Sequence, residues 1–300
     1  MIATGSSLGA CDTDGMAVGS EPIDALAPRD RIDRALEGYL QDVRAEMAGL
    51  TADAALPVDE VIRVIDAGGK RLRPIFGFWG YRSAAGVDGE PIVRAVAALE
   101  LLHTMALIHD DLMDGSIERR GVPASAVALA DRVRGTVAGD PEVVGRSLAI
   151  LAGDLAAVLA DRLFLSSGFD AGRLLAALDR YHRMRTAMAA GQCLDVLGAG
   201  ADPRTVASLK GGGYTVEGPL AIGAALAGAD PRIDAVLAAY GRPLGLAFQL
   251  RDDERDGDAT PAPGEVSGLV AEARRALDGA DLDPAAASAL RELADLVEAG

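Results

Sequence analysis

Two clusters of aspartates with the same spacing are the residues of this sequence best suited to chemistry. The first lies in LIHDDLMD, residues 107–114, and the second lies in FQLRDDERD, residues 248–256. In each cluster two adjacent aspartates are followed by a third one three residues later. Carboxylates this close repel one another unless a cation neutralises them. Mg²⁺ takes carboxylate oxygens and keeps further positions for phosphate oxygens or water. Two such clusters on facing helices would bring six carboxylates into one cavity, which suits Mg²⁺ ions around a diphosphate.

Helical spacing places members of each cluster on one face of their segment. The stripe of the first segment consists of His103, Leu107, Asp110 and Asp114, and that of the second consists of Gln249, Asp252 and Asp256. The alternative interpretations are a solvated acidic helix end for the first cluster and a surface of Arg/Asp ion pairs for the second. The apolar run that leads up to Asp110 favours an interior position for the first.

Basic residues that could hold a second phosphate group are few and clustered. The chain has two lysines, Lys70 and Lys210, and the segment GGKRLRP, residues 68–74, brings Lys70, Arg71 and Arg73 together before a helix. A pair of arginines at residues 119–120 follows the first aspartates by a short loop. Clustered cations suit a phosphate that no metal holds. The alternative for the arginine pair is a solvated surface feature.

The elements that must position these residues are predicted to be helices. Apolar residues recur at spacings of three and four, as over residues 32–43, and aromatic residues make up only 4% of the chain. Glycines and prolines divide the chain into helix-sized segments, and Asp202-Pro203 and Asp230-Pro231 suit helix starts. We therefore expect an all-α fold of about ten helices in one domain over residues 29–300. Residues 1–28, rich in Gly, Ser, Ala and Asp, are expected to be a disordered arm.

Charge and cysteine content exclude several classes of protein. There are 29 basic residues against 45 acidic ones, a net charge of −16, so a basic surface for nucleic acid is not expected. Two cysteines, Cys11 and Cys193, are too few for a disulfide scaffold, and a reducing, cytoplasmic location is expected. Charged residues interrupt the most apolar stretches, so no transmembrane segment is expected, and the first residues lack the pattern of a signal peptide.

Taken together, these segments resemble those of the trans-isoprenyl diphosphate synthases, or polyprenyl synthetases, with bacterial geranylgeranyl and farnesyl diphosphate synthases among them. The resemblance extends in order and approximate spacing from about residue 29 to residue 256. The matching segments are GGKRLRP (68–74), LLHTMALIHDDLMD (101–114), RRG (119–121), LAGD (151–154), GQCLD (191–195), Lys210, and FQLRDD with Asp256.

The resemblance implies a bundle of helices around a deep apolar pocket, in which an allylic diphosphate ionises and isopentenyl diphosphate attacks the cation. The implied Mg²⁺ ligands, for three ions, are Asp110, Asp111, Asp114, Asp252, Asp253 and Asp256. The residues implied to hold isopentenyl diphosphate are Lys70, Arg73, His103 and Arg120. Arg119 and Lys210 would contact the allylic diphosphate, Gln192 and Asp195 would face the cavity, and Gln249 would lie near the cation.

The sequence departs from the family after the second cluster. The family usually has a Gly-rich loop with a lysine there, followed by a further Asp and a Lys-Arg-Thr-like stretch, whereas this chain has DGDATPAPGEVSG and no lysine after Lys210. Gly211 stands where many members carry a hydroxyl side chain, and Glu254 and Arg255 replace an apolar pair. We therefore expect weaker activity than in a standard member, or a need for a partner subunit.

Product length in this family depends on the depth of the pocket below the first aspartates. Ala106 lies one helical turn before Asp110, with Met105 beside it, and neither is one of the bulky aromatic residues that stop growth early. Growth past fifteen carbons is therefore expected, with twenty carbons (C20) as the predicted length, unless a neighbouring helix forms the floor of the pocket.

The expected partners are isopentenyl diphosphate, one allylic diphosphate (dimethylallyl, geranyl or farnesyl) and a second copy of the chain in a homodimer. Two alternatives remain open. A terpene cyclase-like lyase also uses an aspartate-rich helix and Mg²⁺, but GGKRLRP and the pair at residues 119–120 argue against it. A catalytically weak subunit of a heteromeric synthase would explain the missing lysines.

Overall fold

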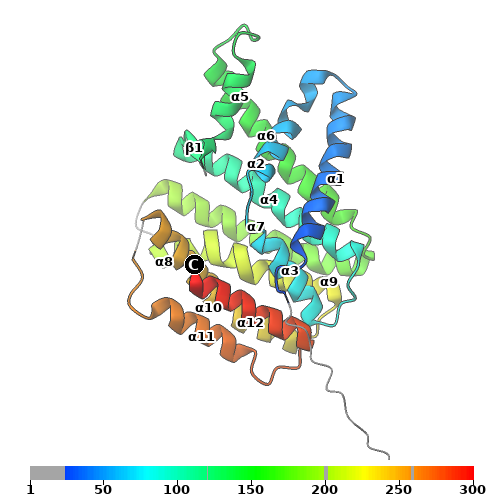
Figure 1. Ribbon diagram of the computed structural model, residues 1–300, viewed down its shortest axis with the longest axis vertical. Coiled ribbons are helices and arrows are strands. Elements are labelled where there is room, and N and C mark those ends of the chain that lie inside the picture. The colour runs from blue at the N-terminus through cyan, green and yellow to red at the C-terminus, as the bar shows by residue number, and fades with distance from the viewer. Residues whose placement is uncertain (1–23, 120, 199–201, 258–259) are drawn as a thin grey trace, which may run out of the picture.

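The computed structural model describes residues 24–119, 121–198, 202–257 and 260–300. Most of the described chain is helical and almost none of it is strand, which confirms the expected all-α class (Figure 1). The elements in chain order are α1 (Arg29–Ala48), η1 (Ala52–Ala55), α2 (Leu56–Asp66), α3 (Leu72–Ser83), α4 (Glu90–Asp114), β1 (Glu118–Arg119), β2 (Val122–Pro123), α5 (Ser125–Val133), α6 (Pro141–Leu165), α7 (Ala171–Leu197), α8 (Pro203–Ala207), η2 (Ser208–Glu217), α9 (Gly218–Ala227), α10 (Pro231–Asp256), α11 (Glu265–Ala276) and α12 (Pro284–Ala299).

Helix α4 is the central element of the bundle. Its residues are buried along most of its length, and it packs against α6, α3 and α1. Figure 1 shows α1, α2, α5 and α6 toward one end of the long axis and α10, α11 and α12 toward the other. Because α4 ends at Asp114, the packing that buries its apolar residues also holds the first aspartate cluster at a defined place.

Aspartates start several helices, as two Asp-Pro pairs in the sequence predict. The Asp202 side chain accepts a hydrogen bond from the backbone N–H of Arg204, and Asp230 accepts from Arg232 and Ile233. In both cases proline follows as the first helical residue, where its missing N–H costs nothing. The start of α10 is thereby set, and with it the position of the second aspartate cluster at its far end.

The segment that carries Lys210 is a π-helix, which the sequence analysis did not anticipate. Element η2 runs over Ser208–Glu217 and lies between α8 and α9. It contains three consecutive glycines, residues 211–213, and packs against α7 and α10. A π-helix makes i→i+5 hydrogen bonds and is rare, and such segments often occur at functional sites.

A short hairpin follows the first aspartate cluster. Strands β1 and β2 pair antiparallel, with Arg119 opposite Val122 and Glu118 opposite Pro123. Gly121 at the turn has a φ of +78°, a conformation that favours glycine. This hairpin turns the chain back so that Arg119 faces the end of α4.

Residues 24–28, which belong to the expected arm, form a turn against the bundle. Ala25 is fully buried and its carbonyl accepts a hydrogen bond from the Trp79 indole at 2.8 Å. The remainder of the expected arm lies outside the described residues.

Two of the described helices, α4 and α6, are long and apolar enough to cross a membrane. Two thirds of the apolar window of α4 is buried inside the bundle, as in the core helix of a globular protein, whereas only 39% of the window of α6 is buried. The expected absence of a transmembrane segment stays a prediction.

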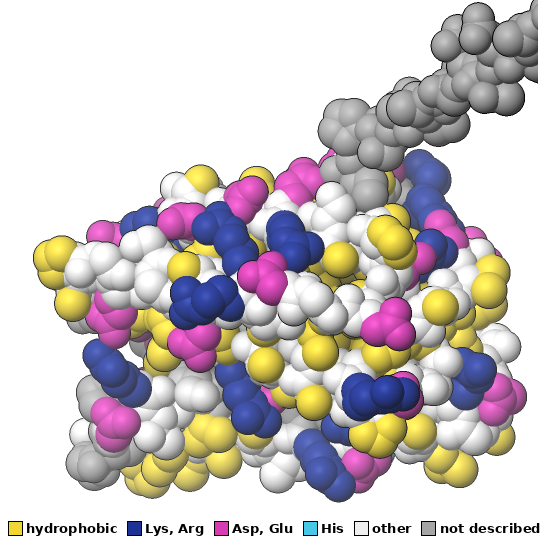
Figure 2. Space-filling model, turned by 90° about the horizontal axis from the view of Figure 1, so that it is seen from below, with side chains coloured by type: hydrophobic (Ala, Val, Ile, Leu, Met, Phe, Trp, Pro, Cys, Tyr) yellow, Lys and Arg dark blue, Asp and Glu magenta, His cyan; other side chains and the backbone are white. Residues whose placement is uncertain are grey.

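The face formed by the last helices carries interspersed charges. Figure 2 views this end of the molecule and shows Lys and Arg side chains next to Asp and Glu, with hydrophobic side chains between them. Arg274 of α11 pairs with Asp295 and Glu298 of α12, and Arg291 pairs with Asp278. These ion pairs join α12 to α11 and to the loop that follows it, in the region where the sequence departs from the family pattern.

Candidate active site

A cavity of about 870 Å³ brings the two aspartate clusters together. Asp110 at the end of α4 and Asp252 at the end of α10 both line it, and Lys210 of η2 lines it as well. Apolar side chains of α4, α7 and α10 form much of the remaining wall, namely Met105, Ala106, Leu107, Met113, Met188, Ala189, Val196, Leu197 and Phe248. The cavity thus has a charged region between the clusters and an apolar wall, as the resemblance implies.

Asp110 is the most heavily contacted carboxylate of the first cluster. Its Oδ1 accepts a hydrogen bond from Gln192 at 3.1 Å and lies 3.2 Å from Lys210 Nζ. Its Oδ2 lies 3.2 Å from a terminal nitrogen of Arg119. Lys210 Nζ also donates to Asp195 Oδ2 at 2.6 Å. Gln192, Lys210 and Arg119 therefore contact Asp110 directly, and Asp195 joins this group through Lys210.

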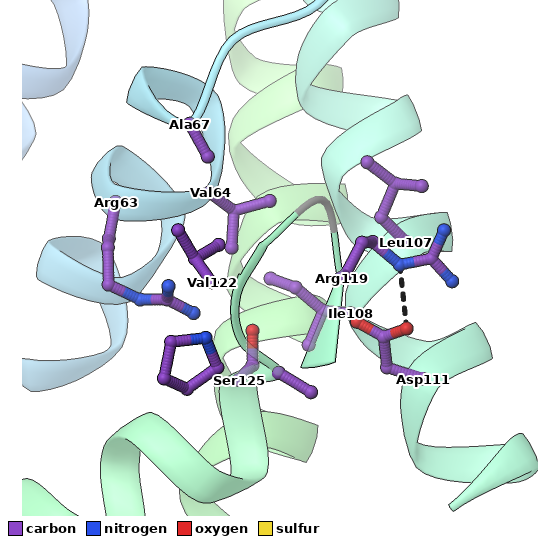
Figure 3. Close-up of a pocket in the computed structure, with 11 residues that line it drawn as sticks. Arg63, Val64, Ala67, Leu107, Ile108, Asp111, Arg119, Val122 and Ser125 are labelled. Atoms are coloured by element: carbon purple, nitrogen blue, oxygen red, sulfur yellow. Dashed lines mark hydrogen bonds and ion pairs between the residues drawn. The ribbon is translucent and has the colours of Figure 1, made fainter. Parts of the chain in front are cut away.

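Asp111 points to a different side of α4 from Asp110, because neighbouring residues of a helix point about 100° apart. It is buried beside a small cavity between α2, α4 and the hairpin, where Arg119 Nε donates to its Oδ1 at 2.6 Å (Figure 3). Burial raises the pKa of Asp111, and Asp110 and Asp114 raise it further, against the lowering effect of Arg119. Arg119 bridges Asp110 and Asp111 and so fixes both carboxylates.

The second cluster is ordered by side chains of its own helix. Arg255 donates to Asp252 Oδ1 at 2.9 Å, and Gln249 Nε2 donates to Asp253 Oδ1 at 2.7 Å. Gln249 also lines the cavity. The side chain of Asp256 lies outside what the structure describes.

Both clusters sit where a helix disfavours negative charge. Asp114 is the last residue of α4, and Asp256 is the last residue of α10. The partial negative charge of a helix C-terminus adds to the repulsion between the carboxylates. Such an arrangement is stabilised by nearby cations, and Lys210, Arg119 and Arg255 are cations that contact the two clusters.

The donor set fits Mg²⁺. Carboxylate oxygens are hard ligands of the type that this ion prefers, and Asp110 and Asp252 present them to one cavity. Among the described residues no three acidic, histidine or cysteine side chains converge on one point. Mg²⁺ usually takes one or two carboxylates and completes its shell with water and substrate phosphate, so this geometry is compatible with it.

The part of the cavity nearest α3 contains Arg73 and His103, two residues expected to hold isopentenyl diphosphate. Arg73 donates to Thr215 Oγ1 at 2.8 Å, and its guanidinium lies 4.7 Å from the centre of the Tyr214 ring. Tyr214 and Thr215 belong to η2 and were not singled out from the sequence. Because η2 follows neither the α-helical nor the strand period, their side-chain directions could not be read from spacing.

Two other predicted residues, Lys70 and Asp114, are placed less centrally. Lys70 is exposed and does not line the cavity, and Asp114 is exposed at the end of α4. Arg120 lies outside the described residues. Arg71, by contrast, is buried and donates to Asp33, Glu100 and the Ile65 carbonyl, so it anchors the GGKRLRP segment.

Comparison with known proteins shows the family to which this chain belongs. The Polyprenyl synthetase family matches residues 58–263, and the chain belongs to this family. A geranylgeranyl diphosphate synthase of Methanosarcina mazei is 33% identical over 217 residues, which is 69% of this chain and 60% of that protein. A (2E,6E)-farnesyl diphosphate synthase of Mycobacterium tuberculosis is 30% identical over 257 residues, which is 81% of this chain and 64% of that protein.

Among solved structures, the fold is similar to that of a geranylgeranyl pyrophosphate synthase from Corynebacterium glutamicum complexed with isoprenyl diphosphate and magnesium. The TM-score is 0.83 at 27% identity, over 92% of this chain and 99% of that one. The chain spans about three fifths of the length of the curated relatives that it matches.

Proposed function

We propose that this chain is a Mg²⁺-dependent trans-prenyltransferase that joins isopentenyl diphosphate to an allylic diphosphate. The observation that carries the proposal is one cavity lined by a carboxylate from each aspartate cluster, by Lys210 and by apolar side chains. Membership of the polyprenyl synthetase family supports the same reaction. The allylic substrate is dimethylallyl, geranyl or farnesyl diphosphate, and the product is geranylgeranyl diphosphate (C20).

The diphosphate of the allylic substrate would lie between the two clusters. Members of the family generally use Mg²⁺, and we assign its ligands, for three ions, to the six aspartates of the two clusters. When bound there, Mg²⁺ neutralises the charge of the diphosphate. Lys210 and Arg119, which already contact Asp110, would add positive charge and hydrogen bonds to the phosphate oxygens.

Isopentenyl diphosphate would bind at the end of the cavity near α3. Arg73 and His103 line that end, and Lys70 and Arg120 are assigned to the same phosphate group by the family pattern. The Tyr214 ring under the Arg73 guanidinium fixes its direction. This arrangement separates the two diphosphates, so that their carbon chains meet in the apolar part of the cavity.

The reaction begins when the bond between C1 and oxygen of the allylic substrate breaks and both electrons leave with pyrophosphate. The π electrons of isopentenyl diphosphate then form a bond to C1, and the resulting cation loses a proton, which pyrophosphate accepts. Lys210 stabilises the negative charge that develops on the leaving group. Gln249 lies at the charged end of the cavity, while Met105, Met188 and Phe248 exclude water from the cation.

A homodimer is proposed from the outer face of α6. Val143, Ile150, Leu151, Val158 and Leu165 are exposed on this helix, with exposed fractions from 49% to 61%. They recur at intervals of seven or eight residues, so they form one apolar stripe along the helix. A second copy of the chain would bury this stripe, and a cytoplasmic location is consistent with such an assembly.

The test is incubation of the purified full chain with labelled isopentenyl diphosphate, Mg²⁺ and each of the three allylic starters, followed by sizing of the products. A C20 diphosphate is expected. Cyclised hydrocarbon formed without consumption of isopentenyl diphosphate would identify a terpene cyclase-like lyase. Elongation that requires a second, different chain would identify a catalytically weak subunit, which the ion pair of Arg255 within the second cluster favours as the second candidate.

A further inference from the structure

The π-helix η2 approaches its neighbours through glycines at three successive points around Lys210. A Cβ on Gly191 of α7 would lie 2.7 Å from the backbone nitrogen of Lys210. A Cβ on Gly212 would lie 2.7 Å from the carbonyl carbon of Gly245 in α10. Both distances are shorter than real Cβ atoms adopt, so backbone meets backbone at these two points.

The third point, at Gly211, differs from the other two. A Cβ on Gly211 would coincide with the carboxamide of Gln249, on the α10 turn that follows Gly245, and would lie only 2.5 Å from the Gln249 Cδ. What occupies the space beside Gly211 is therefore a side chain and not backbone. Gly211 is buried, and Gln249 is half-buried beside it at the wall of the cavity.

The position of the carboxamide determines what its two ends contact. Its oxygen lies against Gly211, and its nitrogen donates to Asp253 Oδ1 at 2.7 Å. The reverse orientation would set the amide oxygen against a carboxylate, and neither atom could donate. Gln249 therefore spans from the π-helix to the second aspartate cluster in one orientation.

We infer that Gly211 is a positioning residue, whose missing side chain seats Gln249 so that Gln249 orients Asp253 in the aspartate cluster. A side chain at residue 211 would displace the carboxamide and break its bond to Asp253. Asp253 would then lose the only described hydrogen bond that holds it, whereas Asp252 would keep Arg255. The link from Asp253 to Mg²⁺ rests on the proposed function, but the contact between Gly211 and Gln249 does not.

A double-mutant cycle separates this role from simple helix packing. The variants are G211A, Q249A and G211A/Q249A, with G212A and G212A/Q249A as matched controls on the neighbouring glycine. The first readout is the thermal unfolding midpoint of the full-length protein without Mg²⁺ or diphosphate.

The effect of G211A on the unfolding midpoint is expected to have opposite signs in the native chain and in the Q249A variant. In the native background G211A lowers the midpoint, because Cβ and the carboxamide compete for one space. In the Q249A background it raises the midpoint by about 1–2 °C, because the space is open and alanine leaves the unfolded chain less conformational freedom than glycine does. G212A lowers the midpoint in both backgrounds, because it meets the Gly245 backbone. An equal loss from G211A in both backgrounds would overturn the inference.

The second readout is the Mg²⁺ concentration that gives half-maximal elongation. G211A and Q249A are each expected to raise it by about tenfold, the size of a lost hydrogen bond to a charged group, and the double variant is expected to raise it no further. Multiplying effects in the double variant would show that Gly211 does not act through Gln249. If the native chain elongates no substrate, the proposed function fails, while the unfolding cycle still decides whether Gly211 seats Gln249.

Discussion

Lys210 Nζ lies 3.2 Å from Asp110 Oδ1, so the cation of the π-helix contacts the first aspartate cluster directly. Burial alone would lower the pKa of Lys210, but its hydrogen bonds and proximity to Asp195 and Asp110 outweigh burial and raise the pKa. Lys210 is therefore charged throughout the neutral range. A permanent cation at this point can bind a diphosphate oxygen at the same place where it now binds Asp110.

Replacing Lys210 by methionine is expected to reduce kcat by about 10²–10³-fold, because the developing negative charge of the leaving group loses one preorganised donor. K70M is the natural comparison, since the chain has one other lysine and it is exposed. K70M should raise the KM for isopentenyl diphosphate more than it lowers kcat. Steady-state kinetics with each substrate varied in turn measures both. Equal effects of the two variants on kcat would contradict the role given to Lys210.

Chelation of divalent ions should stop elongation without unfolding the chain. The described residues offer no group of three ligands that could hold a structural metal, so EDTA is expected to leave the chain folded at the assay temperature. Product formation should fall to background and return when Mg²⁺ is added in excess. Measuring both quantities on one preparation separates loss of activity from loss of structure, and unfolding of the chain by EDTA at the assay temperature would place a metal in its folding.

The sequence predicted the parts of the site that follow a regular period. Asp110 and Asp252 each lie on an α-helix, and both line one cavity, as the repeated spacing indicates. The same helical geometry turns Asp111 away from that cavity, toward Arg119. Arg73 and Gln192 also line the cavity as the family resemblance implies.

The parts that the sequence did not predict depend on irregular backbone and tertiary contact. The π-helix changes the direction of each side chain after Lys210, so Tyr214 and Thr215 could not be placed by α-helical spacing. The sequence places Arg71 beside Lys70 and Arg73 in a basic cluster that suits a phosphate group. Its left-handed φ of +54° and its partners on α1 and α4 come only from the folded chain.

The size of the side chain at Ala106, in the apolar wall that α4 contributes, is expected to control product length. Ala106 lines the cavity one turn before Asp110, so a larger side chain there shortens the space available to the growing chain. The series A106V, A106L and A106F should give progressively shorter products, which mass spectrometry of the diphosphates would measure. An unchanged product length across the series would assign the floor of the pocket to another helix.

The apolar stripe of α6 predicts the assembly state. I150E and V158E place charges in the proposed interface and should each shift the chain from dimer to monomer in sedimentation experiments. L50E is the matched control, because Leu50 is 77% exposed and lies outside α6. If the dimer survives both α6 substitutions, or if L50E disrupts it as well, the stripe is not the interface.

Breaking the buried ion pair of Arg71 and Glu100 is expected to cause a large loss of stability, which a second substitution at Glu100 should largely recover. The two side chains are each 7% exposed and 2.8 Å apart, and Arg71 also donates to Asp33 and to the Ile65 carbonyl. R71M leaves the Glu100 carboxylate buried without its cation, and the free energy of unfolding should fall by about 3–5 kcal/mol.

The double variant R71M/E100M removes both charges and should recover most of that loss, because two apolar side chains of similar length need no compensating charge. R31M, which breaks the exposed pair of Arg31 with Asp88, should cost less than about 1 kcal/mol. Urea unfolding measures all three. A double variant no more stable than R71M would show that the contacts of Arg71 with Asp33 and Ile65, and not its charge balance with Glu100, hold the GGKRLRP segment in place.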